Sequence, residues 1–253
     1  MSEAYVRFTD VHKSFGDKKV LQGITFDILP GETMVVLGGS GSGKSVLIRH
    51  IIGLHKPDRG NVEVDGESVI DYDESRFVPI RKKVAMLFQG GALFDSMSVL
   101  DNVAYGLREH TDMTDEEIGA IARAKLSLVG LEGVDDLMPS ELSGGMKKRV
   151  ALARSIAMDP QCILYDEPTT GLDPVTASAI NDLIRDLQAR LSVTSVVVTH
   201  DIDSAFFVGD RIGYLFEGRM YFVGTVDEAR SSAEPRLRHF LSGGRSAAID
   251  QHE

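Results

Sequence analysis

Short apolar runs, separated by turn signals, occupy the first ninety positions of the chain. The predicted strands are 6–8, 24–28, 34–37, 62–64 and 84–88. The run 34–37 is unbroken and leads directly into glycines, which is typical of a strand buried on both faces that enters a loop. Residues 46–52 follow as a predicted helix that ends near Gly53.

The pattern changes after Gln89, where apolar residues recur at helical rather than alternating spacing. Thr114 followed by Glu117 matches a capping box, and Gly130 is a suitable helix stop. We therefore expect residues 90–155 to form an α-helical subdomain inserted into an α/β core.

Strand patterns return in the last third of the chain. We expect strands at 162–165 and 195–199, a helix opened by Asp173-Pro174, and a hairpin of 211–216 with 220–223 around Glu217-Gly218. Strands that alternate with helices imply a mainly parallel sheet and an α/β fold. The residues that follow Gly244 are expected to fray.

Composition excludes some classes of protein. The net charge of −11 over 253 residues argues against a nucleic-acid binder. Lys147, Lys148 and Arg149 are accordingly interpreted as a solvated helix face. Cys162 is the one cysteine, which excludes an internal disulfide, and its apolar neighbours predict a buried thiol.

Targeting signals are also missing from the sequence pattern. No run approaches the ~18 apolar residues that cross a bilayer. The start, MSEAYVRFTD, lacks the basic-then-apolar pattern of a secretory signal. We expect a cytoplasmic protein unless a partner holds it at a membrane.

A complete phosphate-binding loop follows the buried strand at 34–37. It consists of Gly38, Gly39, Ser40, Gly41, Ser42, Gly43, Lys44 and Ser45. In this strand–loop–helix context, backbone N–H groups turn towards a β-phosphate, and the helix start adds positive potential. We expect Lys44 to reach the β- and γ-phosphates and Ser45 to place its hydroxyl on Mg²⁺. The alternative is a glycine-rich turn that happens to precede Lys-Ser.

Two carboxylates end the apolar strand at 162–165. Asp166 and Glu167 would lie at the carboxyl edge of the sheet, where open α/β sheets bind ligands. We expect Asp166 to hold Mg²⁺ and Glu167 to orient and polarise the attacking water. Read alone, the pair could be an acidic turn before Pro168.

Two further polar residues follow predicted strands. His200 comes after 195–199, where a neutral imidazole can contact the γ-phosphate. Gln89 stands where the sheet passes into the helical subdomain, so its amide can reach Mg²⁺ or the attacking water. Alone, either side chain would be read as an ordinary capping or loop residue.

Ser143, Gly144 and Gly145 open a predicted helix that continues through Met158. Serine and glycines at a helix start form an anion site. A chain needs one phosphate loop per nucleotide, and this chain already has one. A second anion site is therefore useful only if it faces a phosphate held by another subunit. This points to a dimer with nucleotide at the interface.

The ordered set of phosphate loop, Gln89, LSGG, acidic strand end, Gly171-Leu172-Asp173 and His200 resembles the ATPase subunit of ABC transporters. The resemblance covers residues 4–228 as one domain, with a P-loop NTPase (RecA-like) core at 4–89 and 156–228, an N-terminal antiparallel β region, the helical subdomain at 90–155, and a C-terminal tail at 229–253. It implies a head-to-tail homodimer that holds two ATP molecules between phosphate loops and opposing LSGG motifs. It also implies that Phe15 stacks on adenine and that Asp173 links the sites across the dimer.

A narrower resemblance rests on three stretches: KSVLIRHIIGL, GGALFDSMSVLDNVAYGLREH and LMPSELSGGMKKRVALARSIA. They look like the ATPases of Mla/Mce-type (toluene-tolerance type) systems, which move phospholipids across the envelope of bacteria with two membranes. This implies a location on the cytoplasmic face of the inner membrane, a membrane permease, an Mce lipid-binding protein and a small STAS-domain protein. The permease would dock on 92–99 through Leu93, Phe94 and Met97. Met146 stands where glutamine is common, which leaves hydrolysis unaffected.

Other functions remain as alternatives. The chain could energise an importer of another solute, such as an amino acid or a metal. A soluble ABC ATPase of DNA repair or translation would need a coiled-coil insertion or a second cassette, and neither is present. A small-molecule P-loop kinase would explain the phosphate loop but leaves LSGGM and His200 without a role.

Overall fold

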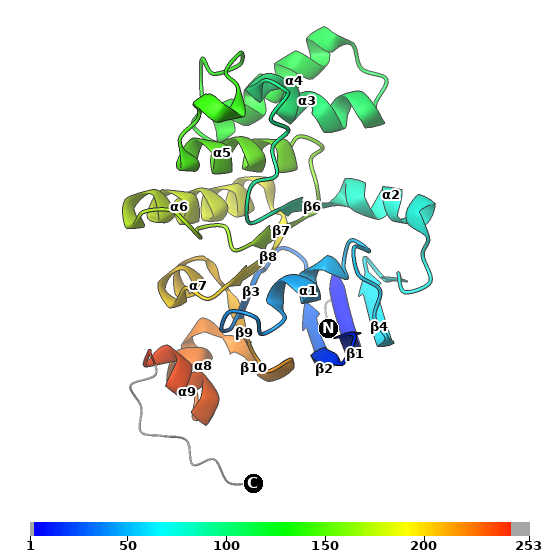
Figure 1. Cartoon of the computed structure of the whole chain (residues 1–253), viewed down its shortest axis with the longest axis vertical. Helices are drawn as coiled ribbons and strands as arrows, with labels where there is room; N and C mark the ends of the chain where they lie inside the picture. The colour runs from blue at the N-terminus through cyan, green and yellow to red at the C-terminus, as the bar shows by residue number, and fades with distance from the viewer. Residues whose placement is uncertain (1–2, 244–253) are drawn as a thin grey trace. The chain divides into compact units, whose positions relative to one another are not determined.

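The computed structural model describes residues 3–243, which fall into two compact units (Figure 1). The first unit combines the residues up to 80 with those from 194 onward, and the second comprises residues 81–193. Both ends of the predicted helical subdomain, 90 and 155, lie inside the second unit. Within residues 3–243, no helix is both long enough and apolar enough to cross a membrane.

The N-terminal part of the first unit is an antiparallel sheet, as predicted (blue and cyan in Figure 1). Its strands are β1 (Val6–Phe15), β2 (Lys18–Ile28), β4 (Arg59–Val64) and β5 (Glu67–Ser68), in the order β2-β1-β4-β5. The rings of Phe8 and Phe26 stack face to face on its buried side, with centroids 5.0 Å apart. β1 and β2 run well beyond the predicted apolar segments, into residues that are mostly half-buried or exposed and therefore carry little apolar signal.

The other strands of the first unit are mainly parallel. They are β3 (Thr33–Leu37), β8 (Thr194–Thr199), β9 (Arg211–Phe216) and β10 (Arg219–Thr225). β3 pairs in parallel with both β8 and β9, and every residue of β3 and β8 is buried, as expected for strands covered on both faces. The predicted hairpin joins β9 to β10, and its turn residues Glu217 and Gly218 both have positive φ, 46° and 74°.

The helices of the first unit differ most from the sequence pattern. They are α1 (Lys44–Arg49), α7 (Ile202–Val208), α8 (Val226–Ser231) and α9 (Pro235–Leu241), while α2 (Glu74–Lys83) crosses from the first unit into the second. α1 begins two residues before the predicted helix 46–52 and ends earlier. α2, α7, α8 and α9 were not predicted. α9 lies within the predicted tail 229–253, whereas the fraying predicted after Gly244 falls outside the described residues.

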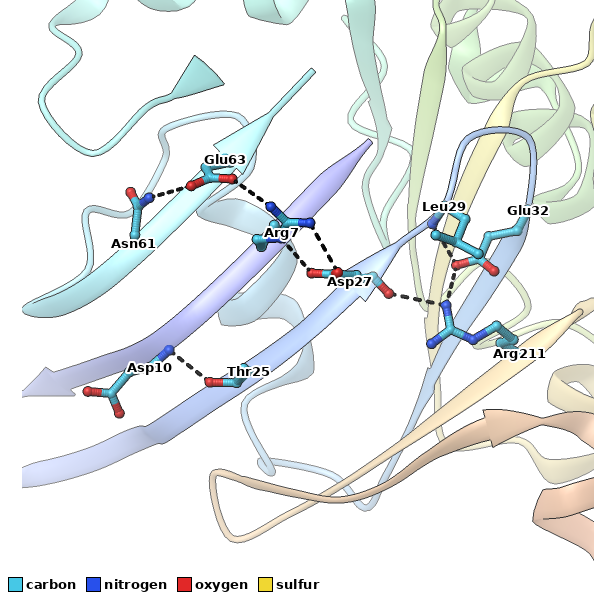
Figure 2. A network of polar contacts seen from close by, with 9 residues as sticks. All are labelled: Arg7, Asp10, Thr25, Asp27, Leu29, Glu32, Asn61, Glu63 and Arg211. Atoms are coloured by element: carbon cyan, nitrogen blue, oxygen red, sulfur yellow. Dashed lines mark hydrogen bonds and ion pairs between the residues drawn. The ribbon is translucent and has the colours of Figure 1, made fainter. Parts of the chain in front are cut away.

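A polar network ties the antiparallel sheet to β3 and β9 within the first unit (Figure 2). Arg211 donates to the Asp27 carbonyl over 3.2 Å and to the Glu32 carboxylate over 2.9 Å. Glu32 is 9% exposed and also accepts from the Leu29 N–H. On the β1 face, Arg7 pairs with Asp27. The network therefore joins the end of β2 to the starts of β3 and β9.

The second unit carries one parallel strand pair and most of the long helices (green to yellow in Figure 1). Its elements are β6 (Val84–Leu87), α3 (Val99–His110), α4 (Asp115–Leu128), the 3-10 turn η1 (Pro139–Glu141), α5 (Gly144–Ser155), β7 (Cys162–Asp166) and α6 (Pro174–Leu191). The predicted Thr114–Glu117 capping box is present at α4. Cys162 is buried in β7, as predicted, and burial raises the pKa of its thiol.

Residues 91–98 of the second unit form a loop, in which the Asn102 side chain binds the carbonyls of Phe94, Met97 and Ser98. One expectation for this unit is wrong in detail. α5 ends at Ser155, three residues before the expected end at Met158.

Candidate active site

The predicted site residues fall into two groups, one in each unit. The phosphate loop, Phe15 and His200 belong to the first unit, and Gln89, Asp166, Glu167, the LSGG residues and Asp173 belong to the second. The internal geometry of each group is described in turn.

The phosphate loop connects β3 to α1, as its strand–loop–helix context predicts. Gly41 and Gly43 have φ values of 76° and 107°, a region that side chains disfavour. A Cβ on Gly38 would lie 2.3 Å from the Leu215 carbonyl oxygen, so this position has room for glycine only. These constraints give the loop its tight turn, the backbone conformation in which successive N–H groups form an anion-binding concavity.

Lys44 folds back over the loop that precedes it. Its Nζ donates to the carbonyls of Gly38 (2.8 Å) and Gly39 (3.0 Å), and the residue is 5% exposed. The ammonium is thus held inside the loop by neutral acceptors. Phosphate oxygens are stronger acceptors for a cation than neutral carbonyls, so a bound nucleotide would draw Lys44 towards itself.

His200 is exposed and follows β8 directly. The Gly38 N–H donates to the carbonyl of the preceding residue, Thr199, over 3.3 Å. This bond brings the end of β8 to the start of the phosphate loop. His200 therefore lies at the same strand edge as the loop, where the sequence places a γ-phosphate contact.

Phe15 ends β1 and is 46% exposed. Its ring meets the edge of His55 at a centroid distance of 5.3 Å, and the Lys13 ammonium lies 5.4 Å from its centroid. An exposed aromatic ring braced by neighbours is suited to stacking on a flat ligand such as a nucleobase.

The acidic pair occupies the end of β7, as predicted. Asp166 is the last residue of the strand and is 1% exposed. Glu167 is 9% exposed, and its φ of 50° is left-handed, which is costly for a residue with a side chain. Thr170 Oγ1 donates to its carboxylate over 3.1 Å. Backbone strain of this kind concentrates at functional sites.

Gln89 lies at the same strand edge as the acidic pair. β6 pairs in parallel with β7, and Leu87 stands opposite Tyr165. The residues that follow each strand are therefore neighbours. The Gln89 side chain is exposed, while its backbone carbonyl accepts a hydrogen bond from Lys148 Nζ.

Lys148 corrects an expectation from the sequence. The Lys147-Lys148-Arg149 run does not form a solvated face, because Lys148 is 7% exposed. Burial lowers the pKa of its ammonium, and the charges of Asp166 and Glu167 partly oppose that shift. Three consecutive cations point in three directions on a helix, so sequence alone did not reveal which one turns inward.

The LSGG residues form the start of α5. Ser143 is the N-cap, and its Oγ accepts from the Met146 N–H over 3.3 Å. Ser143 and Gly144 are exposed. A Cβ on Gly145 would lie 2.7 Å from the Thr176 methyl group, so this glycine allows α5 to approach α6 closely. The result is an exposed helix start without side chains in front of its N–H groups.

Asp173 has a local role that the sequence also indicated, as the residue before the helix-opening proline. It is the N-cap of α6 and accepts from the N–H groups of Val175 and Thr176 at 3.0 Å. Hydrogen bonds from Thr176 lower the pKa of its carboxyl group. The residue is exposed, so its remaining surface faces outward.

Comparison with known proteins shows the family to which this chain belongs. The ABC transporter family model matches residues 21–170. The chain belongs to the ABC transporter family. It is 44% identical over 241 residues to "Probable ribonucleotide transport ATP-binding protein mkl" of Mycobacterium leprae, covering 95% of this chain and 70% of the relative. It is 41% identical over 238 residues to "Intermembrane phospholipid transport system ATP-binding protein MlaF" of Escherichia coli K12, covering 94% and 88%.

A solved structure agrees with this assignment. The dimeric post-hydrolysis state of the ATP-binding cassette MJ0796, bound to ADP and Pi, is similar with a TM-score of 0.81 and 35% identity, over 87% of this chain and 98% of that one. The predicted fold class, an ABC ATPase cassette, is confirmed, and the chain is an ATPase. The resemblance to Mla-type ATPases is confirmed at the level of sequence similarity.

Proposed function

We propose that this chain is the ATP-binding and ATP-hydrolysing subunit of a transporter that moves phospholipids or related lipids across a bacterial envelope. The observation that carries the proposal is the 41% identity to MlaF, which extends over 94% of this chain and 88% of that relative. A match over nearly the full length of both chains includes the surfaces as well as the nucleotide site.

Nucleotide binding is assigned to the first unit. The N–H groups of residues 38–45 and the ammonium of Lys44 would hold the phosphates, and Phe15 would stack on the adenine. His200 would contact the γ-phosphate. The bonds from Lys44 to Gly38 and Gly39 support this role, because they keep the ammonium within the loop until phosphate replaces the carbonyls.

Magnesium is the metal that these residues fit. Mg²⁺ prefers oxygen donors and keeps several waters. Ser45, Gln89 and Asp166 supply a hydroxyl, an amide and a carboxylate oxygen. When bound, Mg²⁺ would neutralise charge on the β- and γ-phosphates.

Glu167 is assigned to the attacking water. It directly follows Asp166, the last residue of β7, is almost completely buried, and is oriented by Thr170. A carboxylate held in this way can orient and polarise a water molecule for in-line attack on the γ-phosphate, where catalysis is largely positioning and electrostatic stabilisation.

A homodimer would complete each site. The exposed Ser143 and Gly144 N–H groups at the start of α5 suit a phosphate from a second copy. Asp173 lies at the start of the neighbouring helix α6 and would approach the partner as well. The similarity to a dimeric ATP-binding cassette supports this arrangement.

The loop 92–98 is assigned to the permease contact. Phe94 is 40% exposed, and its ring lies 4.8 Å from that of Tyr105, which is 38% exposed. Asn102 holds this loop rigidly from beneath. A rigid pair of exposed aromatic rings is a suitable anchor for a protein partner. Leu93 and Met97 are half-buried beside it.

The remaining partners follow from the lipid assignment. The chain would sit on the cytoplasmic face of the inner membrane through its permease, with an Mce-type lipid-binding protein and a STAS-domain protein in the same assembly. Nucleic acid is not expected as a partner, because the chain is acidic overall.

Purification of the tagged chain from native membranes tests the proposal. We expect recovery of a permease and an Mce-type protein, and ATPase activity of that complex that responds to added phospholipid but not to added ribonucleotides other than the substrate. Recovery with a solute-binding protein and its permease instead would reject lipid transport and favour uptake of a small solute.

A further inference from the structure

Helix α5 holds the segment that follows β6 through two cationic side chains. Lys148 Nζ donates to the Gln89 carbonyl. One turn and a half later, Arg154 donates to the carbonyls of Gly91 and Ala92, both over 2.8 Å. Gly91 has a φ of 77°, and a Cβ added to it would lie 3.4 Å from the Ala151 methyl group. The chain from Gln89 to Ala92 is thus fastened along one face of α5.

The two cations differ in what surrounds them. Burial lowers the pKa of the Arg154 guanidinium, which lies over the ring of Phe94. Lys148 is buried as well, but it also interacts electrostatically with both Asp166 and Glu167. A positive charge at this point offsets part of the repulsion between the two carboxylates.

Stability of the fold does not account for this lysine. Taking an ammonium out of water is costly, so a buried charge of this kind is weak evidence for a role in stability. Methionine has the length and flexibility to fill the same space. A lysine at this position therefore calls for a role other than packing.

We propose that Lys148 is a positioning residue for ATP hydrolysis: it fixes the backbone of Gln89 to α5 and places a positive charge beside Asp166 and Glu167. The inference rests on the proposed roles of these three residues. Ser143 begins the same helix. Lys148 therefore also connects the helix that carries the anion site to Gln89.

Two variants and a matched control test this role in the full-length chain. Lys148→Met removes the charge and the hydrogen bond, and Lys148→Arg keeps both. Lys125→Met is the control, because Lys125 is buried to the same degree, 8% against 7%, in the same unit, but pairs with Asp159 instead. Steady-state ATPase kinetics, ATP affinity and thermal unfolding are measured for each protein.

We expect Lys148→Met to lower kcat about tenfold or more while the dissociation constant for ATP stays within about threefold, as for a residue that acts after binding. Lys148→Arg, which keeps the charge and the hydrogen bond, should recover most of kcat, and Lys125→Met should keep a kcat close to that of the wild type. An unchanged kcat in Lys148→Met would overturn the role. So would a loss of kcat that arginine does not restore, or an equal loss of kcat in Lys125→Met.

A second measurement separates this inference from the proposed function. The Gly91 N–H donates to the Phe88 carbonyl over 2.8 Å, in the turn that Lys148 holds. Hydrogen exchange at this turn should be faster in Lys148→Met than in the wild type and unchanged in Lys125→Met. Equal exchange in all three proteins would refute the inference, whether or not the chain hydrolyses ATP. A chain that hydrolysed no ATP would count against the proposed function alone.

Discussion

At the scale of single residues, the central group is Glu167. Replacement by glutamine keeps the size and the Thr170 contact but removes the charge that we propose polarises the attacking water. We expect Glu167→Gln to bind ATP within about threefold of the wild type and to hydrolyse it roughly 100-fold more slowly or worse. Nucleotide-binding and steady-state ATPase assays measure both. Wild-type turnover by the variant would remove Glu167 from the mechanism.

The phosphate loop offers a second residue-scale test with its own control. Gly38→Ala would place a methyl group 2.3 Å from the Leu215 carbonyl oxygen, whereas the same change at Gly39 meets nothing within 4 Å. Overpacking costs about 1–3 kcal/mol, so we expect the melting temperature to fall by about 2–12 °C in Gly38→Ala. Gly39→Ala should melt close to the wild type. Equal melting temperatures would show that the loop yields.

Sequence reasoning located the candidate residues whose position depends on local order. The phosphate loop and the Asp166-Glu167 pair can be read because each directly follows a buried strand. Lys148 could not be read in this way, because its role depends on which side of α5 meets Gln89. That information lies in tertiary packing and not in the spacing of charges.

At the scale of elements, α1 carries a pH-dependent contribution to stability. His50 caps its C-terminal end and is 1% exposed, with Nδ1 2.7 Å from the Val46 carbonyl. Burial lowers the pKa of His50 to about 4. Between pH 6.5 and 4 the unfolded chain therefore binds a proton that the folded chain does not, and the free energy of unfolding falls as the pH decreases through this window.

His50→Leu removes this titration. Between pH 7 and pH 4 the wild type should lose about 3 kcal/mol more stability than the variant, which follows from a shift of about two and a half pKa units. Urea unfolding at a series of pH values measures the difference. Parallel stability profiles for the two proteins would show that His50 takes up its proton in the folded state.

Elements were predictable to different degrees for physical reasons. A capping box predicts α4, and an unbroken apolar run predicts β3. α2 was missed because it carries Pro79 in its interior and buries only Phe77 and Ile80, too few apolar residues for a helical stripe. The bounds of the loop 91–98 could not be predicted, because its polar anchor, Asn102, lies further along the chain.

At the scale of the whole molecule, the exposed rings of α3 and its preceding loop are expected to bind the permease. Phe94→Asp places a charge on that surface and should reduce the amount of permease that co-purifies, while basal ATPase activity of the isolated chain stays unchanged. Met113→Asp is the control, because Met113 is equally exposed in the same unit, 44% against 40%, but lies outside the loop. Equal recovery with both variants would place the contact elsewhere.

The central claim is that two copies of the chain complete each other's ATP sites. Lys44→Ala disables the phosphate loop, and Ser143→Arg blocks the start of α5, so each variant alone should be inactive. In a mixed dimer, one site combines both defects and the other has none. Equal mixing of the purified variants should therefore restore about a quarter of wild-type ATPase activity, since half of the dimers are mixed and each has one intact site. A mixture no more active than the separate variants would contradict the account.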